Sequence, residues 1–396
     1  MCISQYSELS DQALDLSLSS LGLSPEPFLY LQSSRDRRLR EYMVAFDLSA
    51  SVLGDHNTFF WAPPGGGKTA LRIYLLQNCW SMLGSPHPFP VYVTPTHPRD
   101  LSHGSESSSY RYLLRMITSS LVAGLLFQPL RLLDLPMWQQ QFLVGCLDTF
   151  LPIDTNYLVM RIQCGEPIET IAESIVPNYW VDVSLPSAKD IELLALCLQK
   201  YSSAAPRQID MVEEIETAFR QLIQMICTSL GFRSVFLLVD AVDNFPPHYE
   251  SPGILPNWVF SLHGIIKDNP NVWMKAFLPS EVRAELNALI SNESADLQRS
   301  NESFSIVWTQ ERLVEMLRLR VQVASGGRIS SFDAFTGPEF RQLDELIVAS
   351  MPPRPREVLF FAQQVLLAYW RRTGPQGGCL EKTDVEIARS NVRRIE

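Results

Sequence analysis

The sequence predicts an α/β fold, in which a mostly parallel sheet is interrupted by a large helical insertion and followed by a C-terminal helical lid. Three observations support this prediction. A short apolar run at residues 58–61 precedes a glycine-rich loop and a helical pattern. A second apolar run, residues 235–239, ends at Asp240, which is typical of a parallel strand buried on both faces. Between these runs, apolar residues recur every three and four positions from residue 110 to 230, which indicates helices.

The glycine-rich loop fits a phosphate-binding P-loop in which an alanine, Ala62, replaces the leading glycine. Glycines allow consecutive backbone amides to point at phosphate oxygens, and the N-terminus of the next helix adds partial positive charge. In such a loop Lys68 reaches the β- and γ-phosphates, and the hydroxyl of Thr69 joins the shell of a magnesium ion. The predicted nucleotide-binding residues are Pro64, Gly65, Gly66, Gly67, Lys68, Thr69 and Ala70. The alternative is a proline-glycine turn that ends in Lys-Thr by chance, but the strand and helix predicted on either side favour a P-loop NTPase core.

The other elements of this core follow in chain order. Short apolar or β-branched runs bounded by prolines and glycines predict strands, and apolar periodicity with N-capping residues predicts helices. The expected strands are 91–94, 235–239, 272–278 and 304–308, and the expected C-terminal helices are 310–323, 339–350, 356–371 and 383–393.

Two aspartates follow the apolar run at 235–239. Asp240 is predicted to bind magnesium opposite Thr69, because a carboxylate at the end of this strand is the usual partner of a P-loop. Asp243 comes three residues later, and a second carboxylate here would polarise the attacking water. Alternatively, Asp243 caps a turn, since an asparagine and two prolines follow it.

Two arginines near the C-terminus, Arg354 and Arg356, alternate with prolines at the start of a predicted helix. A stiff turn of this kind can direct a guanidinium toward a phosphate, which makes both residues catalytic candidates. The alternative is a proline-rich connector with solvated arginines. Arg318 and Arg320 are further candidates, although either also fits the exposed face of an amphipathic helix.

Composition restricts the class of protein. The chain has 396 residues and a net charge of −10, which argues against general coating of nucleic acid but leaves a local basic patch possible. The seven cysteines include no Cys-x-x-Cys pair, so we expect reduced thiols and no zinc site. The N-terminus lacks the basic and apolar regions of a signal peptide, and no window is long enough to span a bilayer. These features predict a cytoplasmic protein without membrane contact.

We expect four regions. An N-terminal arm covers residues 1–48, and the ATPase core consists of 49–104 together with 231–309. A helical insertion, 105–230, divides the core, and the helical lid covers 310–396.

Together these residues resemble the STAND/AAA+-like branch of P-loop ATPases. The resemblance rests on the segment from Ala62 to Arg72, on residues 237–243, and on the helix start at 353–357. It implies a switch that binds ATP and Mg²⁺ between an αβ core and a helical lid, and that self-associates or acts on a protein partner, in bacteria sometimes in defence or signalling. The chain departs from that branch because no repeat array follows the lid and no effector domain is evident.

Three functions remain open at this point. The first is an ATP-hydrolysing switch, and the second is a scaffold that binds nucleotide without hydrolysis. The third is a small-molecule kinase with the insertion as acceptor domain, although the paired acids Asp240 and Asp243 fit water activation better. A DNA-dependent motor has less support because the chain is acidic and no basic stripe stands out.

Overall fold

The computed structural model describes residues 12–44, 52–81, 86–95, 106–179, 184–202, 212–240, 253–291 and 301–392. By its internal contacts the chain divides into two compact units. The first, here called the C-terminal unit, contains Met1–Asp47, Ala62–Ala70 and Ile306–Glu396. The second, here called the sheet unit, contains Leu48–Trp61 and Leu71–Ser305. The glycine-rich loop therefore groups with the C-terminal helices, although the sequence pattern had grouped it with the strands.

Five parallel strands form the centre of the sheet unit, which confirms the expected α/β class with a parallel sheet. Their order across the sheet is β2-β3-β4-β1-β5, so both outer strands are joined to the centre by long crossovers. The strands are β1 (Asn57–Ala62), β2 (Phe89–Val93), β3 (Val235–Val239), β4 (Val272–Pro279) and β5 (Asn301–Ser305).

Strand β5 lies earlier in the chain than the expected strand at 304–308. Its residues alternate between exposed and partly buried positions, as expected for an edge strand with one face toward solvent. The apolar residues that suggested the strand, Ile306 to Trp308, follow its end and lead into the C-terminal unit. The apolar run at residues 306–308 therefore follows this strand and is not part of it.

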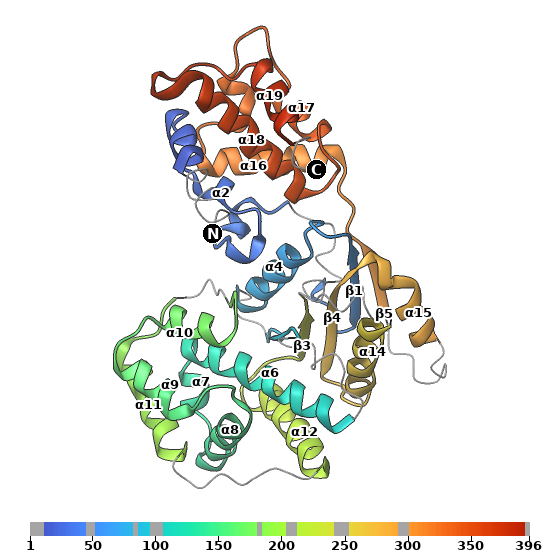
Figure 1. Cartoon of the computed structure of the whole chain (residues 1–396). Helices are drawn as coiled ribbons and strands as arrows, with labels where there is room; N and C mark the ends of the chain where they lie inside the picture. The colour runs from blue at the N-terminus through green and yellow to red at the C-terminus, as the bar shows by residue number, and fades with distance from the viewer. Residues whose placement is uncertain are drawn as a thin grey trace, which may run out of the picture. The chain divides into compact units, whose positions relative to one another are not determined.

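The crossover between β2 and β3 contains most helices of the insertion. Figure 1 shows α7 to α11 grouped beside the long helix α6, which separates them from the strands. Helix α14 packs on β4 and against α15. The helices of this unit are α4 (Lys68–Ser81, whose first three residues group with the other unit), α6 (Glu106–Phe127), α7 (Leu130–Leu133), α8 (Met137–Phe150), α9 (Thr155–Gln163), α10 (Ile168–Ile175), α11 (Ala188–Ser202), α12 (Val212–Thr228), α14 (Ile254–Lys267) and α15 (Arg283–Ser291).

Helix α6 protects the outer edge of β2. An edge strand presents backbone groups that need partners, and here the amide of Tyr92 donates to the hydroxyl of Ser120 on α6 at 3.2 Å. Nearby, Gly124 on α6 allows the ring of Trp80 to approach, because a Cβ at Gly124 would lie 2.9 Å from that ring. The edges of further aromatic rings surround Trp80, including Phe232 at a centroid distance of 5.9 Å. These contacts attach the insertion to the sheet through a continuous apolar core.

The C-terminal unit is a small helical domain with its own hydrophobic core. Its apolar stripes face one another, as amphipathic helices require. Helix α17 begins later than expected because the carboxylate of Asp333 accepts the amide of Leu343, which fixes the helix start there. The helices are residues 12–20, α2 (Glu26–Leu29), α16 (Gln310–Ala324), α17 (Leu343–Ala349), α18 (Pro355–Thr373) and α19 (Lys382–Val392).

The described part of the N-terminal segment, residues 12–44, belongs to this same core. Leu18 is fully buried among side chains of α16 and α18. The hydroxyl of the neighbouring Ser17 donates to the carbonyl of Leu366 at 2.8 Å. Deeper in the unit, buried Arg320 donates to the carbonyl of Pro27 and lies 3.6 Å from Asp36. Arg320 is thus a structural residue that joins the N-terminal segment to α16.

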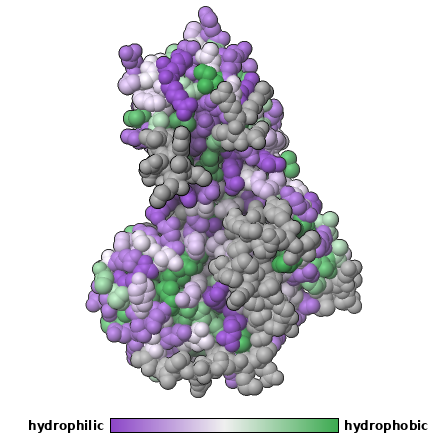
Figure 2. Space-filling view, viewed as in Figure 1, coloured by the Kyte–Doolittle hydropathy of each residue, from purple (hydrophilic) through white to green (hydrophobic). Residues whose placement is uncertain are grey.

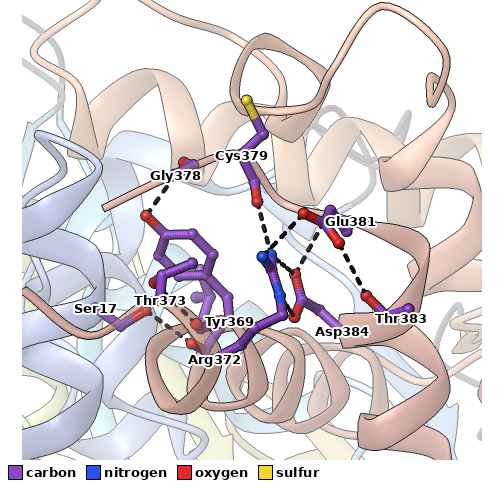
Figure 3. A network of polar contacts seen from close by, with 10 residues as sticks. Ser17, Tyr369, Arg372, Thr373, Gly378, Cys379, Glu381, Thr383 and Asp384 are labelled. Atoms are coloured by element: carbon purple, nitrogen blue, oxygen red, sulfur yellow. Dashed lines mark hydrogen bonds and ion pairs between the residues drawn. The ribbon is translucent and has the colours of Figure 1, made fainter. Parts of the chain in front are cut away.

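Helices α18 and α19 are joined by a compact polar network (Figure 3). Arg372 binds both carboxylate oxygens of buried Asp384, at 2.8 and 2.7 Å. The same guanidinium donates to Glu381 at 2.9 Å and to the carbonyl of Cys379 at 2.7 Å. Such bidentate pairing satisfies a buried carboxylate and fixes its geometry.

The surface in view is mainly hydrophilic over the described residues, with separate apolar side chains between them (Figure 2). Among the described residues, no helix is long and apolar enough to cross a membrane.

Leu18→Ala should destabilise the C-terminal unit by about 2–5 kcal/mol, because the change leaves a cavity in its core. Urea unfolding followed by circular dichroism measures this as a lower midpoint. Leu16→Ala is the matched control, since Leu16 lies on the same helix but is 46% exposed. Equal midpoints for the two variants would show that the N-terminal segment contributes nothing to this core.

Candidate functional site

The glycine-rich loop connects β1 to α4 and makes a tight turn that only glycine accommodates. Gly65 and Gly67 have φ angles of +74° and +92°, which side chains with a Cβ disfavour. At Gly66 the restriction is space, since a Cβ would lie 2.9 Å from both the Cβ of Ala62 and the carbonyl oxygen of Pro63. The amide of Gly66 also donates to that carbonyl, at 3.0 Å. The three consecutive glycines are therefore explained by backbone geometry.

Lys68 is the first residue of α4 and points back over the loop. Its ammonium donates to the carbonyls of Ala62 at 2.9 Å and Pro63 at 3.2 Å, and its side chain is buried. Thr69 and Ala70 follow in the first turn of the helix and are partly buried, whereas Pro64 is exposed. The loop thus holds a fixed positive charge beside a helix N-terminus.

Two residues from the chain after β5 contact this loop within the C-terminal unit. The indole nitrogen of Trp308 donates to the carbonyl of Gly66 at 2.9 Å. The side chain of Arg356 lies against Gly65, 3.3 Å from where a Cβ would stand. Arg356 is in the first turn of α18, so a second helix N-terminus approaches the same loop.

The two C-terminal arginine candidates differ in position. Arg356 lies against the loop, whereas the side chain of Arg354 is 41% exposed and pairs with Glu357 at 3.9 Å. Arg318 pairs with Asp344 and Glu345 at 3.0 and 2.8 Å. Among these candidates, Arg356 is the one that the structure brings to the glycine-rich loop.

Positive charge accumulates at the loop in an unusual arrangement. A cation near a helix N-terminus is electrostatically unfavourable, because that end already carries partial positive charge. Lys68 begins α4 and Arg356 lies in the first turn of α18, and both side chains face the same loop. An anion bound by the loop would compensate both helix ends and both side chains.

At the end of β3, Asp240 is fully buried, and its own amide donates to the carbonyl of Val93 at 3.1 Å. Its carboxylate accepts a hydrogen bond from Nε of Arg72 at 3.3 Å. Arg72 lies on α4, one helical turn after Lys68, and its guanidinium stacks on the ring of Tyr92 at 4.3 Å. Burial raises the pKa of the Tyr92 phenol, and the nearby charge of Arg72 offsets part of that effect. Tyr92 therefore presents a neutral ring to the guanidinium.

Sequence reasoning did not assign roles to Trp308 or Arg72. The spacing of Arg72 and Lys68, four residues apart on one helix, was a signal that both lie on the same face. No sequence signal marked Trp308, because its contact with Gly66 depends on the pairing of β5 with β1. Asp243, the proposed water-activating carboxylate, lies outside the described residues.

Lys275 of β4 is a buried cation that belongs to a different contact network. Its ammonium donates to the carbonyls of Gly54 and His56 and to the hydroxyl of Thr58, each at 2.9 Å, near the amino end of β1. Burial lowers the pKa of Lys275 to about 7. The residue supports the segment that leads into β1.

Comparisons of this chain with protein-family models, with curated proteins and with solved structures gave no match.

Gly66→Ala should destabilise the protein by roughly 1–3 kcal/mol, because the added methyl group meets Ala62 and the loop backbone. Differential scanning fluorimetry would record a lower Tm. Gly145→Ala provides the control, since a Cβ there meets nothing within 4 Å and the residue lies inside α8. That control should gain roughly 0.5–1 kcal/mol from the better helix propensity of alanine. A Tm for Gly66→Ala at or above that of the wild type would refute the tight-turn account.

Proposed function

We propose that the chain binds ATP at the glycine-rich loop and acts as a regulatory switch of the STAND/AAA+-like type. The convergence of Lys68 and Arg356 on one glycine-lined turn is the observation that supports this proposal best. Both cations adjoin a helix N-terminus, so the arrangement suits a ligand with several negative charges. A nucleoside triphosphate has that charge and the length to extend along the loop.

The loop meets the steric requirement for a phosphate. Gly65, Gly66 and Gly67 lack the Cβ atoms that would keep a phosphate from the backbone, so residues 64–70 are proposed to bind it through amide groups. Lys68 then bonds the β- and γ-phosphates in place of the two carbonyls it contacts in this structure. Arg356 is proposed to bond the γ-phosphate, and Arg354 to support the charge nearby.

The hydroxyl of Thr69 and the carboxylate of Asp240 are the proposed magnesium ligands. Magnesium prefers oxygen ligands and keeps several waters, so one carboxylate with phosphate oxygens is a sufficient set. The described residues contain no group of three or more histidine, cysteine or acidic side chains that could hold a metal alone. A bound magnesium ion would neutralise charge on the phosphates. Asp243 would then orient the attacking water.

Switching follows from the contact between loop and lid. Arg356 begins α18, and α18 forms the centre of the C-terminal core together with α16 and α17. Loss of the γ-phosphate would remove the anion that holds Arg356, and this change would pass to the helices that carry it. The proposal includes a protein partner, or a second copy of the chain, as recipient of that signal.

A non-hydrolysing nucleotide-binding scaffold is the second candidate. The hydrogen bond from Arg72 to Asp240 favours it, because this bond holds the proposed metal ligand away from magnesium. ATP binding alone would then order the helical insertion, and Asp243 would be structural.

Lys68→Ala should abolish detectable ATP binding in calorimetry, and Arg356→Ala should weaken it about tenfold or more, since a charged hydrogen bond contributes about 1.5–3 kcal/mol. Arg354→Ala serves as the matched control and should change affinity less than Arg356→Ala. Wild-type affinity in Lys68→Ala would eliminate the proposed phosphate site.

Release of inorganic phosphate from ATP distinguishes the two candidate functions. A hydrolysing switch should release phosphate with magnesium, lose this activity in Asp240→Asn, and slow about 100-fold or more in Asp243→Asn. Tight ATP binding without phosphate release, with and without candidate partners, would favour the scaffold.

A further inference from the structure

Arg72 and Asp240 form a buried ion pair, and the proposed switch assigns a role to Asp240 but none to Arg72. Both side chains have no exposed surface. Asp240 is anchored by its backbone bond to Val93, and Arg72 is anchored by α4, so the pair connects the end of β3 with the helix that Lys68 begins.

The pairing is incomplete. Only Nε of Arg72 bonds Asp240, at 3.3 Å, and among the described residues neither terminal nitrogen of the guanidinium, NH1 or NH2, has a hydrogen-bond partner. A buried donor without a partner costs about 1–3 kcal/mol, and more when it is charged. The guanidinium of Arg72 therefore has two donors that a further acceptor could satisfy.

Arg372 shows what a structural arginine looks like in this chain. It binds both oxygens of Asp384 and has two further acceptors, at distances of 2.7 to 2.9 Å (Figure 3). Arg72 makes one hydrogen bond to the carboxylate of Asp240, at 3.3 Å, and its two amino groups have no acceptor among the described residues. An oxyanion with several oxygens, such as a phosphate, supplies the acceptors that are lacking.

We propose that Arg72 is an exchangeable counter-ion that holds Asp240 in the nucleotide-free protein and releases it when magnesium and ATP bind. This inference rests on the proposed function. Asp240 then turns from the guanidinium to the metal, and Arg72 turns its amino groups to phosphate oxygens. Charge stays balanced at each stage, because each ion exchanges one partner of opposite charge for another and no covalent bond changes.

The exchange explains how ATP and magnesium control a buried carboxylate. Without nucleotide, the positive charge of Arg72 opposes binding of a divalent cation at Asp240. With nucleotide, the phosphates attract Arg72 and leave Asp240 available. Magnesium binding at Asp240 would thus depend on ATP being present.

The test measures ATP affinity by calorimetry on the full chain, once with saturating Mg²⁺ and once with EDTA, and compares the ratio of the two affinities. In Arg72→Gln this ratio should rise at least about tenfold, because magnesium loses its competitor and Mg²⁺-free ATP loses a cationic partner. Arg72→Lys retains the charge and should stay near the wild-type ratio. Arg320→Gln removes a buried arginine elsewhere and should leave the ratio unchanged.

Asp240→Asn provides a second measurement if Arg72→Gln does not fold. Release of Arg72 from its carboxylate should raise ATP affinity in EDTA, whereas a purely structural pair predicts no change or a decrease. A wild-type ratio in folded Arg72→Gln, with ATP binding still dependent on Lys68, would overturn the exchange but not the proposed function. Absence of ATP binding by the wild type under both conditions would overturn the proposed function itself.

Discussion

The parallel direction of all five strands is the constraint on which the candidate site depends. In a parallel sheet every strand ends at the same edge, so the segments that leave the strands emerge together. Trp61 of β1 lies opposite Ser305 of β5, which means that the glycine-rich loop and residues 306–308 begin side by side. The bond from Trp308 to Gly66 follows from this register. Strand pairing thus places the segment that follows β5 beside the glycine-rich loop.

The buried arginines of this protein show how charge is accommodated in its interior. Arg372, whose side chain is 29% exposed, has several acceptors and fastens α18 to α19. Buried Arg320 binds the carbonyl of Pro27 and pairs with Asp36, although its Nε has no partner among the described residues. Arg72 differs, because its single bond to Asp240 leaves much of the guanidinium unsatisfied among the described residues. Desolvation of a buried ion is costly, so the two unpartnered amino groups of Arg72 are the observation on which the proposed exchange rests.

The long helical insertion is possible because it enters between two neighbouring strands of the sheet. Strands β2 and β3 pair directly and run parallel, so the helices between them leave the carboxyl end of β2 and return to the amino end of β3. Helix α6 then covers the edge of β2, where Ser120 accepts the amide of Tyr92. The insertion therefore covers an edge of the sheet. Trp80 of α4 packs against Gly124 of α6 and so links α4 to the insertion.

Local sequence was sufficient to predict the α/β class, the strands β1 to β4, the helical nature of the insertion and the glycine-rich turn. These features depend on apolar periodicity and on backbone freedom at Gly65, Gly66 and Gly67, which are properties of neighbouring residues. The roles proposed for Lys68, Thr69 and Asp240 were inferred from the same local patterns, and they remain predictions. Strand β5 was misplaced, because an exposed edge strand carries no apolar run.

Only the tertiary structure decided that Arg356 and Trp308 contact the loop, that Arg72 holds Asp240, and that residues 12–44 share a core with the C-terminal helices. Each of these contacts joins residues that are far apart in the chain. Their proximity depends on strand order, register and helix packing, which a single sequence does not display. The sequence by itself determined a tight turn that requires glycine, whereas the fold determined which cations lie beside it.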